Sequence, residues 1–201
     1  MNSSPIMVLG ELSAAHARAV RKALATTGND GMDVIVESPG GRLALALHIA
    51  RDLTAAGRHV RTHAFSRLGS AAIAVFAAGA SRTCRAETEF RFHPVRRELS
   101  GWFGSSQLAR VALRMERDET DYATFLAART GRNASFWRRM MRRSSTIVGA
   151  DAVKTGLATE LVERESVFDG DRAVEAEPCQ GSGTTSGWTI RFRRIDKETT
   201  P

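Results

Sequence analysis

The chain has 201 residues, of which 42% are hydrophobic, enough for one domain with a substantial core. This composition excludes an intrinsically disordered chain, a collagen-like repeat and a disulfide-rich scaffold. The 29 basic residues outnumber the 22 acidic ones, giving a formal charge of +7, which is compatible with a negatively charged partner.

Cysteine usage and the lack of long apolar segments bear on where the protein resides. Cys84 and Cys179 have neither metal-site spacing nor the pattern of a disulfide framework, which favours a reducing compartment. The start of the chain lacks the features of a signal peptide. The longest weakly polar run, residues 68–80, is shorter than the ~20 residues of a membrane span. We therefore expect a soluble, cytoplasmic protein without a metal or a cofactor.

The first half of the chain alternates between strand and helix patterns. In chain order, the expected elements are a strand at 6–9, a helix at 11–26, a strand at 33–37, a helix at 42–56, a strand at 60–65, a helix at 70–78 and a strand at 88–93. This order is typical of parallel βαβ units with right-handed crossovers, so we expect an α/β fold.

After Pro94 the pattern becomes helical and then polar. The expected elements are helices at 107–129 and 134–143, a helical turn at 151–156 and a strand at 157–162. Beyond these, residues 163–201 are polar, with one candidate edge strand at 188–192. We expect residues 1–162 to form the α/β domain and residues 163–201 to be a partly disordered C-terminal extension.

The segment Ser38-Pro39-Gly40-Gly41 stands where the strand at 33–37 gives way to a helix. Paired glycines let backbone N–H groups approach a ligand, and the start of the helix adds positive partial charge. This suits an oxyanion hole or an anion cradle. The alternative interpretation is a tight turn without a ligand.

Two residues with reactive side chains stand at the ends of predicted elements. Ser70 opens the helix of small residues at 70–78, where a serine is either an N-cap or a nucleophile. His93 ends the strand at 88–93, where it is either structural or a general base. Taken singly, each residue leaves both interpretations open.

Together, the order and spacing of these segments resemble the proteolytic subunit of the Clp protease family. GSAAIAVFAAGA at 69–80 is similar to the family's nucleophile segment, and FRFHP at 90–94 is similar to its histidine segment. Further similar segments are SPGG at 38–41, TG at 130–131 and AVKTGL at 152–157. The resemblance covers roughly residues 6–162. It implies a crotonase-like spiral of βαβ units with a helical handle at about residues 105–145.

The resemblance also implies a serine endopeptidase that acts on peptides. Ser70 is then the nucleophile and His93 its general base, since a serine hydroxyl needs a base to take its proton. The residues implied for the oxyanion hole are Gly40 or Gly41, together with Ala71.

One position departs from the family pattern at the third member of the catalytic triad. The gapless register between Gly131 and Gly156 places Ser144 where the family carries an aspartate. A hydroxyl orients a histidine but does not stabilise its charged form as a carboxylate does. With Ser144 at the acid's position among the catalytic residues, we expect a weak Ser-His dyad, a substitute carboxylate such as Asp151, or a degenerate site.

The predicted handle also suggests self-association. Its helices carry apolar residues that a compact core need not cover, which predicts a homo-oligomer, a dimer or a ring. These residues are Leu108, Val111, Phe125, Leu126, Phe136, Trp137 and Met140. The family also implies an AAA+ unfoldase as partner, although the docking segment before residue 6 is expected to be short.

Two other functions remain open at this stage. A catalytically weak or inactive ring subunit with an assembly role is compatible with Ser144. A crotonase-type acyl-CoA enzyme shares the backbone oxyanion hole, but such enzymes use carboxylates in place of a serine–histidine pair. The basic segment WRRMMRR at 137–143 is more typical of a solvated or inter-subunit helix face than of a nucleic-acid site.

Overall fold

The structure is a computed structural model in which the chain forms two compact units, Met1–Leu161 and Val162–Pro201. The described residues are 6–26, 31–56, 60–162, 172–178 and 188–194. In the second unit, β9 (Arg172–Pro178) and β10 (Trp188–Arg194) form an antiparallel pair. The rest of the extension expected to be partly disordered lies outside the described residues.

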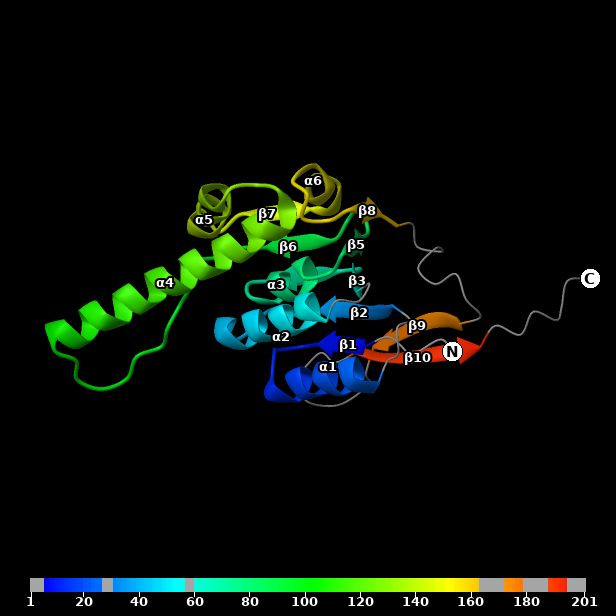
Figure 1. Ribbon diagram of the computed structural model, residues 1–201, viewed down its shortest axis with the longest axis horizontal. Helices are drawn as coiled ribbons and strands as arrows, with labels where there is room; N and C mark the ends of the chain where they lie inside the picture. Colours follow the sequence, from blue (N-terminus) through cyan, green and yellow to red (C-terminus); the bar gives the residue numbers. More distant parts are fainter. Residues whose placement is uncertain (1–5, 27–30, 57–59, 163–171, 179–187, 195–201) are drawn as a thin grey trace, which may run out of the picture. The chain divides into compact units, whose positions relative to one another are not determined.

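The first unit is built on a five-stranded sheet (Figure 1). Across the sheet, its strands are β1 (Ile6–Leu9), β2 (Met32–Glu37), β3 (Val60–Ala64), β5 (Ser81–Cys84) and β8 (Glu160–Leu161). All four neighbouring pairs are parallel, and parallel neighbours need crossover connections. The α/β fold with a parallel sheet is thus confirmed.

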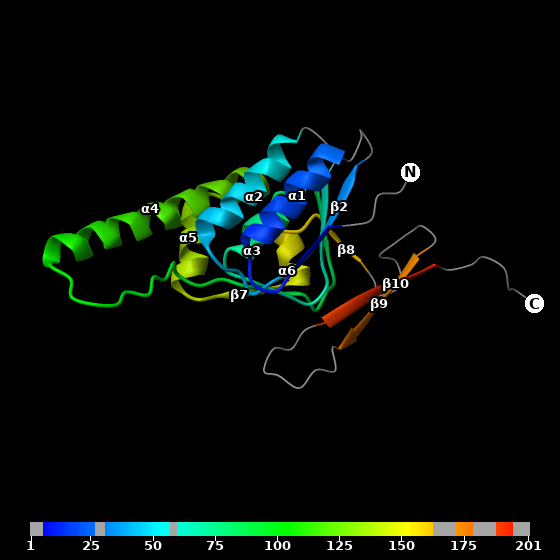
Figure 2. The same ribbon diagram turned by 90° about the horizontal axis from the view of Figure 1, so that it is seen from below.

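Three helices lie on one side of this sheet (Figure 2). They are α1 (Ala14–Thr26), α2 (Leu43–Ala55) and α3 (Ala72–Ala77). In β2, Val34 and Val36 belong to the core, whereas the alternating Asp33 and Glu37 are only half-buried. This alternation follows from the pleat of a strand, which turns successive side chains to opposite faces.

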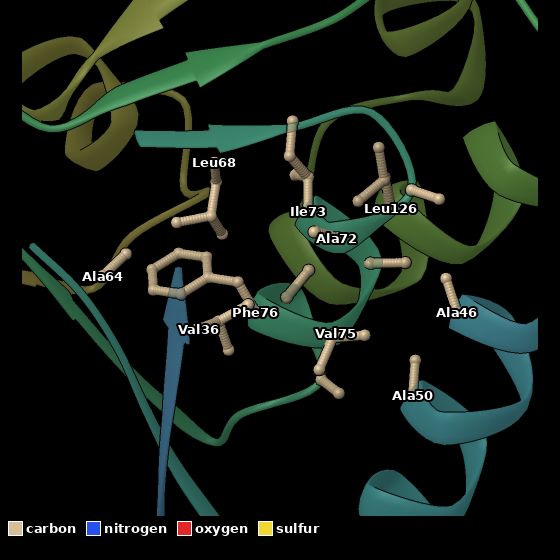
Figure 3. Close-up of a cluster of buried hydrophobic side chains, with 14 of the residues drawn as sticks. Val36, Ala46, Ala50, Ala64, Leu68, Ala72, Ile73, Val75, Phe76 and Leu126 are labelled. Atoms are coloured by element: carbon tan, nitrogen blue, oxygen red, sulfur yellow. The ribbon is translucent and has the colours of Figure 1, made fainter. Parts of the chain in front are cut away.

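The centre of the core is α3, whose six residues are all buried. Figure 3 shows its side chains between Ala46 and Ala50 of α2 on one side and Val36 and Ala64 on the other. The helix that follows Ser70 is therefore held on every side, which fixes the position of its first turn.

Two arginines bind the carboxyl end of α3. The guanidinium of Arg129 donates to the carbonyls of Ala77, Ala78 and Gly79, at 3.1 Å each. Arg82, which is 7% exposed, donates to the carbonyl of Gly79 at 2.8 Å. Burial, together with the charge of Arg129, lowers the pKa of Arg82. These donors satisfy carbonyls that the helix itself leaves unpaired.

A second, smaller sheet stands beside the first. Its strands, in order, are β4 (Arg67–Gly69), β6 (Glu89–Arg91) and β7 (Thr146–Val148). β4 pairs with β6 in parallel, and β6 pairs with β7 antiparallel. At one edge, Gly69 is opposite Arg91, which in turn is opposite Thr146. Residues that follow β4 and β6 and precede β7 are thereby brought together.

The predicted handle consists of α4 (Ser105–Thr130) and α5 (Ala134–Arg142), followed by α6 (Gly149–Lys154). Figures 1 and 2 show the first half of α4 extending beyond the other helices of the unit. Residues 96–110 are all exposed. The buried residues of α4, Tyr122, Ala123 and Leu126, lie in its second half.

The apolar face expected on these helices is only partly exposed. The prediction that the core leaves Leu126 and Trp137 exposed is wrong, because both side chains are fully buried. The ring of Trp137 stacks on Phe92 with centroids 5.5 Å apart, and its Nε1 donates to Thr130 Oγ1 at 3.0 Å. The large exposed apolar residues of this region are Leu99, Trp102, Phe103, Leu108 and Leu113.

Among the helices of the described segments, none is both long and apolar enough to cross a lipid bilayer. Within the same segments, no group of three or more His, Cys, Asp or Glu residues is placed to hold a metal ion.

Candidate active site

Two loops touch where β2 and β4 end. The N–H of Gly69 donates to the carbonyl of Ser38 at 2.9 Å. A Cβ added to Gly40 would lie 2.6 Å from the Cβ of Ser70, and one added to Gly69 would lie 2.7 Å from the carbonyl oxygen of Pro39. Gly40 also has a φ of +113°, which other residues rarely adopt. Glycines are thus needed here because the two backbones are in direct contact.

Ser70 is held in an unusual conformation at the start of the core helix. Its φ is +54°, in the left-handed region, and its N–H donates to the carbonyl of Arg91 at 2.8 Å. The N-cap of α3 is Ala71, without a side-chain cap hydrogen bond. Among the described residues, the Ser70 hydroxyl has no hydrogen-bond partner. The N-cap interpretation is therefore not realised, and a half-buried serine hydroxyl stays free beside a helix start.

His93 follows β6, two residues after the carbonyl that binds the Ser70 N–H. Its Nδ1 lies 2.7 Å from the carbonyl oxygen of Pro94. Because a carbonyl only accepts, this hydrogen bond places the ring proton on Nδ1 and leaves Nε2 as an acceptor. Within the described segments, no hydrogen bond joins His93 to Ser70.

Ser144 precedes β7, and the antiparallel pairing of β6 and β7 brings this part of the chain to the end of β6 that leads to His93. The pairs Phe90–Ile147 and Arg91–Thr146 continue through a hydrogen bond from the Phe92 N–H to the Ser145 carbonyl at 2.8 Å. The pairing stops there, because Ser144 stands in a turn in which its N–H donates to the Met141 carbonyl at 3.0 Å. Ser144 has a φ of +48° and is exposed. Among the described residues, its hydroxyl forms no hydrogen bond with the imidazole.

No carboxylate in the described part of the chain forms a hydrogen bond or an ion pair with His93. Asp151, the candidate substitute acid, accepts a hydrogen bond from Lys154 Nζ at 2.9 Å on the exposed side of α6. That hydrogen bond raises the pKa of Lys154. The imidazole is thus oriented by a main-chain carbonyl and not by an acid.

The three residues expected in the oxyanion hole differ in whether their N–H groups are free. The N–H of Gly40 donates to Ser38 Oγ at 3.1 Å. The N–H groups of Gly41 and Ala71 donate no hydrogen bond among the described residues. Gly41 comes directly after Gly40, and Ala71 comes directly after Ser70, the two residues in contact. The N–H groups that are free to bind an oxyanion are therefore those of Gly41 and Ala71.

The sequence profile of the Clp protease family matches residues 1–165. The chain belongs to the Clp protease family. The match covers both contacting loops, His93 and Ser144, so the resemblance stated from five short segments is confirmed. No curated protein sequence matched this Clp protease chain.

Two contacts of this Clp protease domain were not predicted from its sequence. One is the Pro94 carbonyl on His93. The other is the hydroxyl of Tyr122, which donates to the carbonyl of Ser70 at 2.6 Å. A main-chain carbonyl that accepts a hydrogen bond cannot be identified from the type of residue. Tyr122 stands among the core positions of a long helix, where an aromatic residue indicates packing.

Proposed function

We propose that this member of the Clp protease family is a serine endopeptidase with Ser70 as nucleophile. The observation that carries the proposal is the free hydroxyl of Ser70 at the start of a fully buried helix, with the loop at 38–41 packed against it. Such a half-buried serine with a positive φ, between the end of a strand and the start of a helix, is the geometry that presents a nucleophile to a substrate.

His93 serves as the general base. With its proton on Nδ1 held by the Pro94 carbonyl, the Nε2 lone pair is available for the proton of Ser70 Oγ. The two side chains come within hydrogen-bond distance when substrate is bound, as hydrogen bonds of catalytic sites often tighten only in the complex. Ser70 Oγ then bonds to the substrate carbonyl carbon as its proton passes to His93.

The N–H groups of Gly41 and Ala71 stabilise the oxyanion that this attack creates. The imidazolium gives its proton to the leaving amine, the C–N bond breaks, and an ester to Ser70 remains. Water hydrolyses the ester with His93 again as base, which restores the serine.

The same geometry predicts slow turnover. A carbonyl at Nδ1 fixes the tautomer and orientation of the imidazole, but it does not neutralise the imidazolium as a carboxylate does. Ser144, in the turn before β7, offers at most a second neutral group. The absence of an acid bound to His93 among the described residues favours the second candidate function, a ring subunit of low or no activity that serves assembly.

We also propose that the chain forms homo-oligomers. Members of the family generally form oligomeric rings. In this chain Trp102, just before α4, is fully exposed and Leu113 of α4 is 63% exposed. Burial of both side chains against a second copy would remove apolar surface from water.

Labelling with a biotinylated fluorophosphonate, followed by mapping of the modified peptide, tests the catalytic proposal. Wild-type protein should be labelled on Ser70, the Ser70→Ala variant should not be labelled, and His93→Ala should be labelled much more slowly. Ser105→Ala, at an exposed position of α4, is the matched control and should be labelled like wild type. Label on another residue would contradict the proposal, and no label on an assembled oligomer would establish the inactive ring subunit.

A further inference from the structure

One hydroxyl of the handle reaches the residue proposed as nucleophile. Tyr122, the single tyrosine of the chain, lies in the second half of α4 and is 3% exposed. Its Oη donates to the Ser70 carbonyl at 2.6 Å, and the N–H of Ile73 approaches the same oxygen at 3.3 Å. The tyrosine therefore makes the shorter of these two hydrogen bonds, and no step of the proposed reaction uses its hydroxyl.

This hydrogen bond acts on a peptide group with a second role. The carbonyl of Ser70 and the N–H of Ala71 belong to the same peptide, which is trans, so they point in opposite directions. Whatever fixes the carbonyl also fixes the N–H. The Ala71 N–H is one of the two donors proposed for the oxyanion.

Ser70 needs such support because its φ of +54° is unfavourable for a residue with a side chain. A conformation of this kind persists only where several contacts fix it. On one side, the Ser70 N–H is bound to the Arg91 carbonyl of β6 at 2.8 Å. On the other, the Ser70 carbonyl is bound by Tyr122. Without the tyrosine hydroxyl, the Ser70 carbonyl keeps only the longer hydrogen bond from the Ile73 N–H at 3.3 Å.

We propose that Tyr122 is a positioning residue, whose hydroxyl orients the Ser70–Ala71 peptide so that the Ala71 N–H faces the developing oxyanion. The inference rests on the proposed peptidase function. Burial raises the pKa of Tyr122, so its hydroxyl stays a donor throughout the usual assay range. A hydrogen bond accepted by the carbonyl also polarises the peptide and makes its N–H a stronger donor.

The Tyr122→Phe variant removes the hydroxyl and keeps the buried ring. We expect kcat for an activated peptide ester to fall roughly tenfold, a fraction of the ~10²–10³ lost with a whole oxyanion donor, with KM unchanged. The affinity of a peptide boronate, which forms a tetrahedral adduct on serine, should fall by a similar factor. The affinity of the corresponding cleaved peptide should not change, because it places no oxyanion in the site.

Thr130→Val is the matched control, because it removes another hydroxyl of α4. Thr130 Oγ1 accepts from Trp137 and donates to the Leu126 carbonyl, and neither contact involves Ser70. This variant should lose thermal stability while keeping the kcat and the boronate affinity of wild type. An equal loss of kcat in both variants would show that Tyr122 acts only through stability.

Hydrogen–deuterium exchange separates this inference from the proposed function. Residues 68–74 should exchange faster in Tyr122→Phe than in wild type, and Thr130→Val should leave their exchange unchanged. If the wild-type protein has no Ser70-dependent activity, the proposed function fails and exchange alone decides the role of Tyr122. Unchanged exchange, or unchanged kcat in an active enzyme, would overturn the inference.

Discussion

Gly40 and Ser70 are in such close contact that a Cβ on the glycine would stand 2.6 Å from the Cβ of the serine. The loop that ends β2 and the residue that precedes α3 therefore form one packed unit, although they are distant in the sequence. Any change in the loop at 38–41 is transmitted directly to the proposed nucleophile.

Gly40→Ala should abolish activity and lower the melting temperature. The new methyl group would collide with Ser70 and with the Gly69 carbonyl, 2.9 Å away, in addition to the strain of a φ of +113°. Gly101→Ala is the control, because Gly101 has a φ of +100° and no atom within 4 Å of the added Cβ. Fluorophosphonate labelling and thermal melts of both variants test this. Equal effects would show that backbone strain, and not the contact with Ser70, is responsible.

Ser144→Asp should increase kcat, by about tenfold or more out of the ~10⁴ that the acid of a complete triad contributes. The pairing of β6 and β7 brings the segment before β7, which contains residue 144, to the end of β6 that leads to His93, and aspartate tolerates the φ of +48° found there better than most residues. The new carboxylate has to replace the Pro94 carbonyl at Nδ1. We would measure kcat/KM on an activated ester.

Ser145→Asp controls for charge alone, because it adds the same carboxylate one residue further along. It should leave kcat/KM near the wild-type value. If Ser144→Asp folds and is no faster than wild type, residue 144 does not act on the histidine.

The sequence predicted the parallel core of this protein better than its second sheet. The β-branched run Val34-Ile35-Val36 and the all-apolar segment of α3 could be predicted from their residue types, because both are fully buried. The strands β4 and β7 of the second sheet and β5 of the parallel sheet were not predicted, since each mixes polar and apolar residues over three or four positions and shows no clear period.

The candidate site was predictable in its side chains and not in its main-chain contacts. Ser70 and His93 could be selected because a family pattern fixes their spacing. The hydrogen bonds of Tyr122 to Ser70 and of His93 to Pro94 depend on carbonyl directions, which follow from tertiary packing. The approach of the segment before β7, with Ser144, to the end of β6 likewise exists only once β7 pairs with β6.

Arg129→Met should lower the free energy of unfolding by about 1–3 kcal/mol, the cost of leaving buried carbonyls without a partner. Its guanidinium binds three carbonyls at the end of α3, and methionine keeps the length of the side chain without the donors. Arg114→Met, at an exposed position of α4, is the control and should change stability little. Urea unfolding followed by circular dichroism measures both. Similar free energies of unfolding for the two variants would show that the hydrogen bonds of Arg129 at the end of α3 do not stabilise the protein.

Asp33→Asn should destabilise the protein more at pH 6 than at pH 2. Burial alone would raise the pKa of Asp33, but hydrogen bonds from His63 at 3.0 Å and from Arg61 at 2.6 Å lower it well below the usual range. A carboxyl whose pKa is lowered by folding stabilises the protein above its unfolded pKa of ~4, and that contribution is lost as the pH falls toward the folded value.

Urea midpoints measured between pH 6 and pH 2 test this dependence. The deficit of Asp33→Asn relative to wild type should shrink below pH 4. Asp121→Asn, in an exposed residue without an ion pair among the described residues, should show no such change. A deficit that stays constant with pH would mean that the charge of Asp33 contributes nothing.

Trp102→Glu combined with Leu113→Glu should dissociate the proposed homo-oligomer into smaller species without unfolding the subunits. Trp102 is 101% exposed and Leu113 is 63% exposed, so neither supports the core of its own subunit, and each is free to be buried by a second copy. A charge buried in an apolar interface costs more than the interface gains from either side chain. Light scattering at micromolar concentration gives the mass, and circular dichroism checks the fold.

Leu161→Glu, at an apolar residue that is 42% exposed on β8, is the control and should keep the wild-type mass. A wild-type protein that is monomeric, or a double variant with unchanged mass, would exclude this surface as the interface.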